Sequence, residues 1–308
     1  MPNIRIEAVT PVHNRRELTL ECLKSLFSID LDGIDLSVTV VDDGSTDGTA
    51  EAISSAFPDV KIISGNGDLW YTAGMNLGIK AALEKEPDYI LGFNNDSVFD
   101  KKFLINMVDT AEKVDRSVIG AVLIDWEDRN SIFQVSPQWN VWWGGLRHWR
   151  KQTLDTLPTS PWEVPIIVGN CVLIPAEALK AAGLMDEQRL PQFGDAGLTP
   201  KMKKLGWKLL IDPRVCVYCK PNDIPVSFGA LSIKDKYKAL FNDPYGPHGI
   251  KRRFYTNYFA APNKIQGIAA FIIFYARVLI GKNIEGRWGM DQNEKPLAVI
   301  FADKIIRR

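Results

Sequence analysis

The sequence of 308 residues predicts an α/β fold with a mostly parallel, mixed sheet and a helical C-terminal extension. Strand-like and helix-like segments alternate through the first half, polar loops follow three of the strands, and the composition changes near residue 227. Alternating strands and helices favour a parallel sheet covered by helices. Ligands bind beyond the carboxyl ends of such strands. We therefore expect the three polar loops to meet at one ligand site.

The first half contains four predicted strands and four predicted helices in alternation. β-branched runs mark the strands, and apolar residues three and four positions apart mark the helices. Ser45 or Thr46 is expected to cap the second helix, and Asp100 the fourth. The strands are expected at 4–9, 36–41, 60–63 and 89–93, and the helices at 16–27, 45–56, 75–83 and 100–108.

The second half is less regular. An apolar, β-branched stretch at 164–174 is interrupted by Gly169 and Asn170. Two short helices are expected at 176–182 and 196–205, because each is followed by a glycine. A strand at 207–211 follows. The long connection at 124–165 holds six of the nine tryptophans, and long loops inside compact domains are more often functional than accidental.

The composition is that of an ordinary soluble protein, with 46% apolar and 24% charged residues. Lys and Arg total 37 and so do Asp and Glu, which argues against nucleic acid as a partner. The charge is unevenly placed, because residues 231–308 hold 14 Lys and Arg against 6 Asp and Glu, a net charge of +8. Such a segment is attracted to an anionic membrane face. A solvated helical surface is the alternative.

The cysteines and the apolar runs indicate a cytoplasmic protein, at most peripheral at the inner membrane face. Four cysteines with a lone C-x-x-C are expected to be reduced thiols rather than a zinc site or a disulfide framework. The N-terminus has no signal-peptide core. The longest apolar run, 268–280, contains Arg277 and is shorter than the span of about 20 residues that a bilayer requires.

Two of the polar loops carry carboxylates at strand ends. Asp96 follows a buried strand, and Mg²⁺ or Mn²⁺ needs only one or two carboxylates when phosphates and waters complete its shell. The triplet 94–96 is also typical of an Asx turn. Asp42 and Asp43 repel each other, so one of them gains from a ligand donor. The alternative at 42–47 is a plain turn with a helix cap.

The loop at 65–70 contains glycines that allow a ligand to approach the backbone closely. Trp70 follows them and is expected either to cover a sugar or base face or to pack in the core. Together these segments resemble the family-two glycosyltransferases, which have the GT-A fold, a Rossmann-like nucleotide-diphospho-sugar transferase fold. The matching segments are 10–15, 41–49, 65–78, 94–96, 168–174, 183–187, 193–195 and 204–209.

The resemblance spans about residues 4–220 and is nearest to bacterial members that build surface and cell-wall glycans, including rhamnosyltransferases. It implies three groups of site residues. The nucleoside pocket would be lined by Pro11, Asn14, Arg15, Asp42 and Asp43; the nucleotide or donor sugar would be approached by Gly67, Trp70, Gly74 and Asn76; and Asn94, Asn95 and Asp96 would occupy the family's Asp-x-Asp position, with Asp96 as the metal ligand.

Asp195 occupies the position of the family's catalytic base. Inverting sugar transfer needs a carboxylate to accept the proton of the acceptor hydroxyl. The alternative for Asp195 is the N-cap of the helix that follows Gly194. The sequence departs from the family in lacking a second acid beside this residue and a late histidine at 217–220. His248 or Cys219 would have to replace that histidine as a metal ligand.

The sequence thus predicts an inverting, metal-dependent glycosyltransferase using Mg²⁺ or Mn²⁺ and a UDP- or dTDP-linked sugar donor. The acceptor would be a hydroxyl of a bacterial glycan. One form of the hypothesis has that glycan attached to a lipid. A sugar nucleotidyltransferase is the first alternative, although residues 10–16 lack the glycines of its phosphate loop. A catalytically inactive glycan- or nucleotide-binding homologue is the second.

Three regions are expected along the chain: a nucleotide-sugar-binding half at 1–98, an acceptor-binding half at 99–226, and a basic, aromatic extension at 227–308. The tryptophan-rich stretch 139–150, with His148, predicts a lid that binds the acceptor, or alternatively a hydrophobic cover or dimer contact. The extension is expected to contact a membrane or to form a homodimer interface.

Overall fold

The computed structural model describes residues 3–135, 137–147, 153–220, 228, 231–243 and 248–279. The chain folds into two compact units. The core unit comprises Met1–Val135 and Thr153–Pro221, and the second unit comprises Ser136–Gln152 and Asn222–Arg308. The sequence analysis does not predict that the stretch before Thr153 joins the C-terminal extension.

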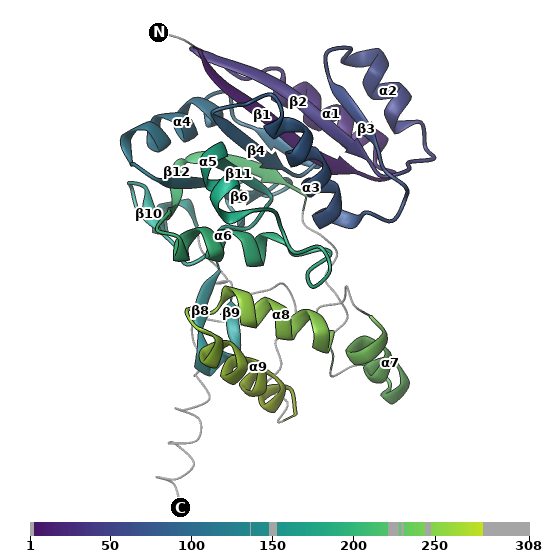
Figure 1. The fold of residues 1–308 in the computed structure, drawn as a ribbon, viewed down its shortest axis with the longest axis vertical. Helices are drawn as coiled ribbons and strands as arrows, with labels where there is room; N and C mark the ends of the chain where they lie inside the picture. Colours follow the sequence, from purple (N-terminus) through teal and green to yellow (C-terminus); the bar gives the residue numbers. More distant parts are fainter. Residues whose placement is uncertain are drawn as a thin grey trace, which may run out of the picture. The chain divides into compact units, whose positions relative to one another are not determined.

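The core unit is built on one mixed sheet, which confirms the predicted α/β fold (Figure 1). Its strand order is β10-β12-β6-β11-β4-β1-β2-β3, with β5 paired to β12 and β7 to β6. The pairs β1–β2, β1–β4, β2–β3 and β6–β12 are parallel, whereas β11 runs antiparallel between β4 and β6. The strands are β1 (Ile4–Val12), β2 (Ile34–Asp42), β3 (Lys61–Ser64), β4 (Tyr89–Phe93), β5 (Ser97–Phe99), β6 (Ser117–Asp125), β7 (Ile132–Gln134), β10 (Trp162–Glu163), β11 (Cys171–Pro175) and β12 (Lys208–Cys219).

Helices pack on both faces of this sheet, because neighbouring residues of a strand point to opposite sides. In β1, Ala8 belongs to a hydrophobic cluster with α1, α2 and α4, whereas Val9 belongs to a cluster with α3, α5 and α6. Both residues are fully buried. The helices are α1 (Arg16–Leu26), α2 (Thr49–Ala56), α3 (Trp70–Leu83), α4 (Phe103–Lys113), α5 (Ala176–Ala182) and α6 (Asp195–Lys204), with a single 3-10 turn η2 (Leu154–Thr156).

The structure corrects two helix starts and adds strands that the sequence analysis does not expect, among them β5, β6, β7 and β10 of the core sheet. Helix α2 begins only at Thr49 after Gly48, because the backbone N–H groups of Ser45 and Thr46 bind the side chains of Asp42 and Asn14 instead of starting a helix. The residue before α4 is Lys102 rather than Asp100. Strand β6, which is buried throughout, lies between β11 and β12 and is absent from the expected elements.

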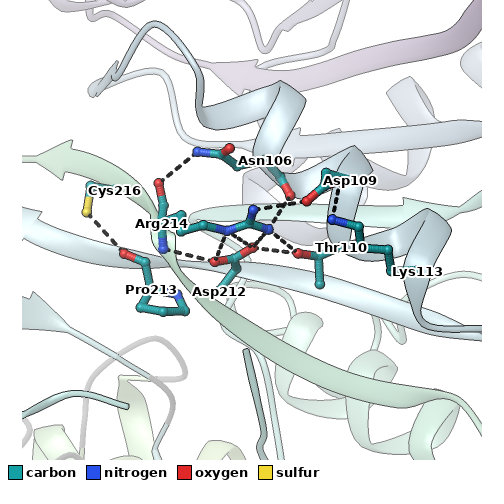
Figure 2. A network of polar contacts seen from close by, with 8 residues as sticks. All are labelled: Asn106, Asp109, Thr110, Lys113, Asp212, Pro213, Arg214 and Cys216. Atoms are coloured by element: carbon teal, nitrogen blue, oxygen red, sulfur yellow. Dashed lines mark hydrogen bonds and ion pairs between the residues drawn. The ribbon is translucent and has the colours of Figure 1, made fainter. Parts of the chain in front are cut away.

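An irregularity in β12 carries an ion-pair network around one buried carboxylate (Figure 2). The pairing of β12 with β6 shifts register between Ile211 and Cys216. Within that segment Asp212 is fully buried, and its carboxylate accepts hydrogen bonds from Thr110 Oγ1 at 2.6 Å and from Arg214 Nη2 at 2.7 Å. Arg214 also reaches Asp109 on α4 at 2.9 Å. A buried carboxylate is tolerated only when it is paired in this way.

This network fixes the strand that supports the 94–96 triplet. Beyond the irregularity, Val217–Cys219 of β12 pair antiparallel with β5. Strand β5 begins at Ser97, directly after Asp96. The anchoring of β12 to α4 therefore sets the position of the residue next to the expected metal ligand.

The second unit contains a short hairpin and a helical extension, and the helical extension was expected. Strands β8 (Gln138–Asn140) and β9 (Gly145–Arg147) flank the 3-10 turn η1 (Val141–Trp143). A Cβ on Gly144 would lie 2.8 Å from Phe274 Cα, and one on Gly145 would overlap Asn257 Oδ1, so only glycine allows the hairpin to pack here. The helices are α7 (Ile233–Tyr237), the π-helical segment η4 (Lys238–Asn242), α8 (Ile250–Ala260) and α9 (Lys264–Leu279).

The cysteines and the apolar segments follow the expectations within the described residues. None of the four cysteines forms a disulfide in the structure, and Cys22, Cys171 and Cys219 are buried. None of the described helices has the length and hydropathy that a bilayer crossing requires. Of the expected lid, 148–150 with His148 lie outside the described residues.

The Asp212 network predicts a stability effect at Arg214. Arg214→Met keeps the aliphatic stem but leaves the buried Asp212 carboxylate without its cation, so the free energy of unfolding should fall by about 2–3 kcal/mol. Arg189→Met is the matched control, because the partner of Arg189, Asp186, keeps 30% of its side chain exposed. The control should change stability by less than about 1 kcal/mol. Equal effects in urea denaturation would contradict the assignment.

Candidate active site

The loops after β1, β2 and β4 meet at one edge of the sheet, as their parallel pairing requires. Val12 and Asp42 are partners in the β1–β2 register. A ring nitrogen of His13, Nδ1, lies 2.6 Å from the backbone oxygen of Asp43. Arg15 Nη1 donates to Asp96 Oδ2 at 2.8 Å, which joins the loop after β1 to the triplet after β4. Three segments far apart in the chain therefore share one edge.

The carboxylate of Asp43 holds the start of α3. Its Oδ1 accepts the N–H of Gly67 at 2.8 Å, and its Oδ2 accepts those of Leu69 at 2.8 Å and Trp70 at 3.2 Å. Asp43 is 7% exposed. Trp70 adopts a positive φ of 58°, a conformation that costs a non-glycine residue energy and needs such support. The structure thus shows Asp43 positioning the glycine loop, a contact that the sequence analysis does not predict.

Asn14 joins the first two loops to each other. Its backbone N–H donates to Ser45 Oγ at 2.9 Å, and its Oδ1 accepts the N–H of Thr46 at 2.7 Å. Asn14 has a positive φ of 51°, which asparagine tolerates better than most residues. Asp42 supports the same turn, because its Oδ1 accepts the N–H of Ser45 at 3.1 Å. Asn14 and Arg15 are exposed at this edge, where a ligand can reach them.

Gly74 and Asn76 fix α3 to its neighbours. A Cβ at Gly74 would lie 2.9 Å from Pro11 Cβ, so glycine permits α3 to pack on the end of β1. Asn76, which is 3% exposed, accepts the N–H of Met185 at 3.1 Å and donates to Met185 O and Glu187 Oε2, both at 3.0 Å. These contacts assign both residues a positioning role for α3. Whether they approach a donor stays a prediction.

Trp70 lies at the surface of the site rather than in the core. Its side chain is 40% exposed, so the core-packing alternative is wrong. Its indole Nε1 donates to Asp68 Oδ1 at 2.8 Å, which orients the ring beside the glycine loop. An exposed, oriented indole next to Gly67 has the geometry of a surface that covers a ring of a ligand.

The triplet 94–96 contains the carboxylate that is expected to bind metal. Asp96 is 7% exposed, and burial raises its pKa, while the guanidinium of Arg15 acts in the opposite direction. Asn95 donates to Thr19 Oγ1 at 2.9 Å, and the backbone N–H of Asn94 donates to Asn170 O at 3.0 Å. The second of these bonds ties the triplet to the segment that precedes β11.

The donor atoms at this place fit Mg²⁺ or Mn²⁺. Both ions prefer oxygen ligands and retain several waters, so one carboxylate and neighbouring amide oxygens suffice when a phosphate completes the shell. Within the described residues there is no cluster of three or more His, Cys, Asp or Glu side chains. An ion at this edge would therefore have Asp96 as its carboxylate ligand and would depend on its substrate for further ligands.

Asp195 is the first residue of α6, and Gly194 holds the N-cap position. The N-cap alternative therefore does not describe Asp195. Its Oδ2 accepts the backbone N–H of Gly169 at 2.9 Å, and Tyr71 donates its hydroxyl to the carbonyl of the same glycine at 3.1 Å. Burial and the nearby Asp195 charge raise the pKa of Tyr71, so its hydroxyl stays protonated as a donor. Asp195 is half-buried.

Thr72 links α3 to the segment before Asp195, a contact that the sequence analysis misses. Its N–H donates to Pro191 O at 2.9 Å, its hydroxyl donates to Leu190 O at 2.6 Å, and that hydroxyl accepts the N–H of Gly194 at 3.1 Å. The sequence offers one signal for these contacts, which is that Tyr71 and Thr72 directly follow Trp70 in the segment 65–78 that matches the family. Residues 43, 96 and 195 are thus connected through α3 and the 168–170 segment.

The two candidates for the late histidine lie in different units of the chain. Cys219 is buried against Ser97 Oγ at 3.6 Å, and burial raises the pKa of its thiol to about 12. His248 belongs to the second unit, where burial, Arg253 and Arg252 lower its pKa to about 4. Its ring packs against Phe228 with centroids 4.9 Å apart.

Comparison with known proteins gives a curated rhamnosyltransferase as a relative. N-acetylglucosaminyl-diphospho-decaprenol L-rhamnosyltransferase of Mycobacterium tuberculosis is 26% identical over 193 residues, which are 56% of this chain and 62% of that protein. The chain therefore matches only about three fifths of the length of this curated relative.

Two solved structures share the fold. S. aureus TarS 1-349 in complex with UDP-GlcNAc has a TM-score of 0.55 and 15% identity, covering 90% of this chain and 73% of that one. The mannosyltransferase PcManGT of Pyrobaculum calidifontis, in complex with GDP-Man and Mn²⁺, has a TM-score of 0.51 and 16% identity, covering 99% and 80%. The model of glycosyl transferase family 2 matches residues 7–183, more than half of the chain. With the GT-A arrangement of its sheet and strand-end loops, the chain belongs to glycosyl transferase family 2.

Proposed function

We propose that this protein transfers a sugar from a nucleoside-diphosphate sugar to a hydroxyl group of a bacterial surface or cell-wall glycan, with inversion at the anomeric carbon. The single observation that carries the proposal is the connection of Asp43, Asp96 and Asp195 around one edge of the sheet. Membership of glycosyl transferase family 2 supports the reaction class.

The donor nucleotide would lie along the loops after β1 and β2. Asn14 and Arg15 are exposed there, and Asp43 holds the glycine loop in place beneath Trp70. The guanidinium of Arg15, paired with Asp96, offers further donors to a phosphate or a base. A UDP- or dTDP-linked donor is the expectation from the sequence, and the TarS structure with UDP-GlcNAc supports the first of these.

Asp96 would hold Mg²⁺ or Mn²⁺, with Asn94 and Asn95 orienting water around it. The ion would supply charge neutralisation for the departing diphosphate. Mn²⁺ is present in the PcManGT structure, which supports a divalent ion for this fold. The Arg15 side chain lies at the same carboxylate and adds a fixed positive charge on that side of the site.

Asp195 would act as the base. The N–H of Gly169 donates to its Oδ2 and so orients the carboxylate. The acceptor oxygen forms a bond to the anomeric carbon while the bond from that carbon to the diphosphate oxygen breaks, and the hydroxyl proton passes to Asp195. Attack opposite the leaving group inverts the anomeric centre.

The acceptor is proposed to be a lipid-linked glycan. The mycobacterial relative is named for a diphospho-decaprenol acceptor and for rhamnosyl transfer. The net charge of +8 in residues 231–308 suits a substrate presented at an anionic surface. The protein would then work at the inner membrane face.

A thermal-shift panel with UDP, dTDP and GDP, each with and without Mn²⁺, tests the donor and the metal together. A ligand at 100 times its Kd stabilises the folded state by about 2.7 kcal/mol. One nucleotide with Mn²⁺ should raise Tm most, and Asp96→Asn should abolish the contribution of Mn²⁺ while leaving the metal-free shift. An undiminished Mn²⁺ effect in the variant would remove Asp96 from the metal site.

Asp195→Asn should lower kcat about 10²–10⁴-fold, because the amide cannot accept the proton. Nucleotide binding in the thermal-shift panel should stay unchanged. Asp59→Asn, in an exposed turn before β3, is the control and should keep full activity. Full transfer activity in Asp195→Asn would assign the base elsewhere. Pyrophosphate release from a sugar phosphate and a nucleoside triphosphate would instead favour a nucleotidyltransferase.

Asp43→Asn should damage both stability and nucleotide binding. The neutral amide cannot reproduce the bonds that the charged carboxylate makes to the N–H groups of Gly67, Leu69 and Trp70, so the free energy of unfolding should fall by about 1–3 kcal/mol. Asp68→Asn, in the same loop but exposed, should cost less than about 0.5 kcal/mol. Chemical denaturation and the nucleotide-induced Tm shift measure the two effects.

A further inference from the structure

The second unit carries a helical segment with three largely exposed apolar side chains. Helix α7 and segment η4 run consecutively over residues 233–242, and none of these residues is buried. Ile233 is 87% exposed, and Tyr237 and Phe241 are each 60% exposed. Their spacing of four residues places them on one face, here called the exposed stripe. The rings of Tyr237 and Phe241 contact each other, with centroids 4.9 Å apart.

Packing within the chain gives this helix little support. A helix of ten residues is marginal in water when nothing packs on it. Ser232 starts it, because its hydroxyl accepts the N–H of Asp235 at 3.2 Å, but such a cap contributes only about 1 kcal/mol. A contiguous exposed apolar face of this kind marks an interaction surface. A partner that covered the exposed stripe would therefore stabilise the helix.

The charges on the helix favour an anionic partner for the exposed stripe. Lys234, Lys236 and Lys238 alternate with the stripe, while Asp235 is engaged by the Ser232 hydroxyl at 2.6 Å. Two copies meeting through this stripe would bring six lysines together, which disfavours self-association. A basic helix with one apolar face is instead complementary to a bilayer with anionic headgroups. At about 15 Å it is too short to cross one.

We propose that residues 233–242 dock on an anionic membrane surface. Ile233, Tyr237 and Phe241 enter the boundary between headgroups and acyl chains, and the lysines contact lipid phosphates. Tyr237 suits this depth, because its ring is apolar and its hydroxyl remains at the polar level. The inference deepens the proposed work at the inner membrane face, on which it rests, by naming the segment that makes the contact, and vesicle binding tests it without a sugar donor.

Vesicle flotation with the full chain tests the inference. Vesicles of phosphatidylglycerol mixed with phosphatidylcholine should bind the protein, and vesicles of phosphatidylcholine alone should bind it at least about tenfold more weakly. Ile233→Asp combined with Phe241→Asp should lower binding to the anionic vesicles about tenfold or more. Lys234→Glu combined with Lys238→Glu should have a similar effect that high salt reduces.

Ile265→Asp is the matched control, because Ile265 on α9 is 81% exposed and lies outside the stripe. This variant should bind vesicles like the unaltered chain. Since none of the substituted residues in 233–242 is buried, all variants should keep the Tm of the parent protein. Equal binding by Ile233→Asp/Phe241→Asp and the parent, or an equal loss in Ile265→Asp, would overturn the proposal.

A change in oligomeric state would also overturn the proposal. If the parent chain self-associates, ignores anionic vesicles and becomes monomeric on Phe241→Asp, the stripe binds a second copy. Sugar transfer to a soluble acceptor, measured without vesicles, is unaffected by the stripe variants if the inference holds. Failure of vesicle binding and failure of the proposed activity are therefore separate results.

Discussion

The carboxylate of Asp43 is the constraint on which the site depends. Its two oxygens accept three backbone N–H groups at the start of α3, so the end of β2 determines where that helix begins. The first turn of α3 then reaches two further segments, through Tyr71 to Gly169 and through Thr72 to the stretch before Gly194. The position of Asp195 is therefore set by a chain of hydrogen bonds that starts at Asp43.

Asp96 depends on a second, separate support. Strand β5 follows it and pairs with the end of β12, which the buried Asp212 carboxylate and Arg214 fasten to α4. The ion pair with Arg15 then connects this side of the site to the loop after β1. The proposed donor side and the proposed acceptor side are thus held by different parts of the core and meet only at the strand ends.

Local pattern was enough to predict the alternating elements and the edge of the sheet where the loops meet. It was not enough for features that depend on distant partners. The caps expected at Ser45 and Asp100 failed because Ser45 is engaged by Asp42 and Asn14, and α4 begins after Lys102. Asp43 binds the 65–70 loop and Asn76 binds Met185, and both partners are distant in the chain. Residue spacing therefore does not predict these positioning roles. The sequence pattern did not predict the hydrogen-bond partners of these residues, and their roles toward a substrate stay predictions.

The hairpin of Gly144 and Gly145 has a consequence for how such a chain can be rearranged. These glycines fit against Phe274 and Asn257, yet they are inserted in the sequence between β7 and β10 of the core unit. A truncation after residue 221 would remove α8 and α9, which pack on the hairpin. Recombination between homologues would likewise have to exchange two separate stretches of the gene together to keep these contacts. We therefore expect the hairpin and the extension to evolve together.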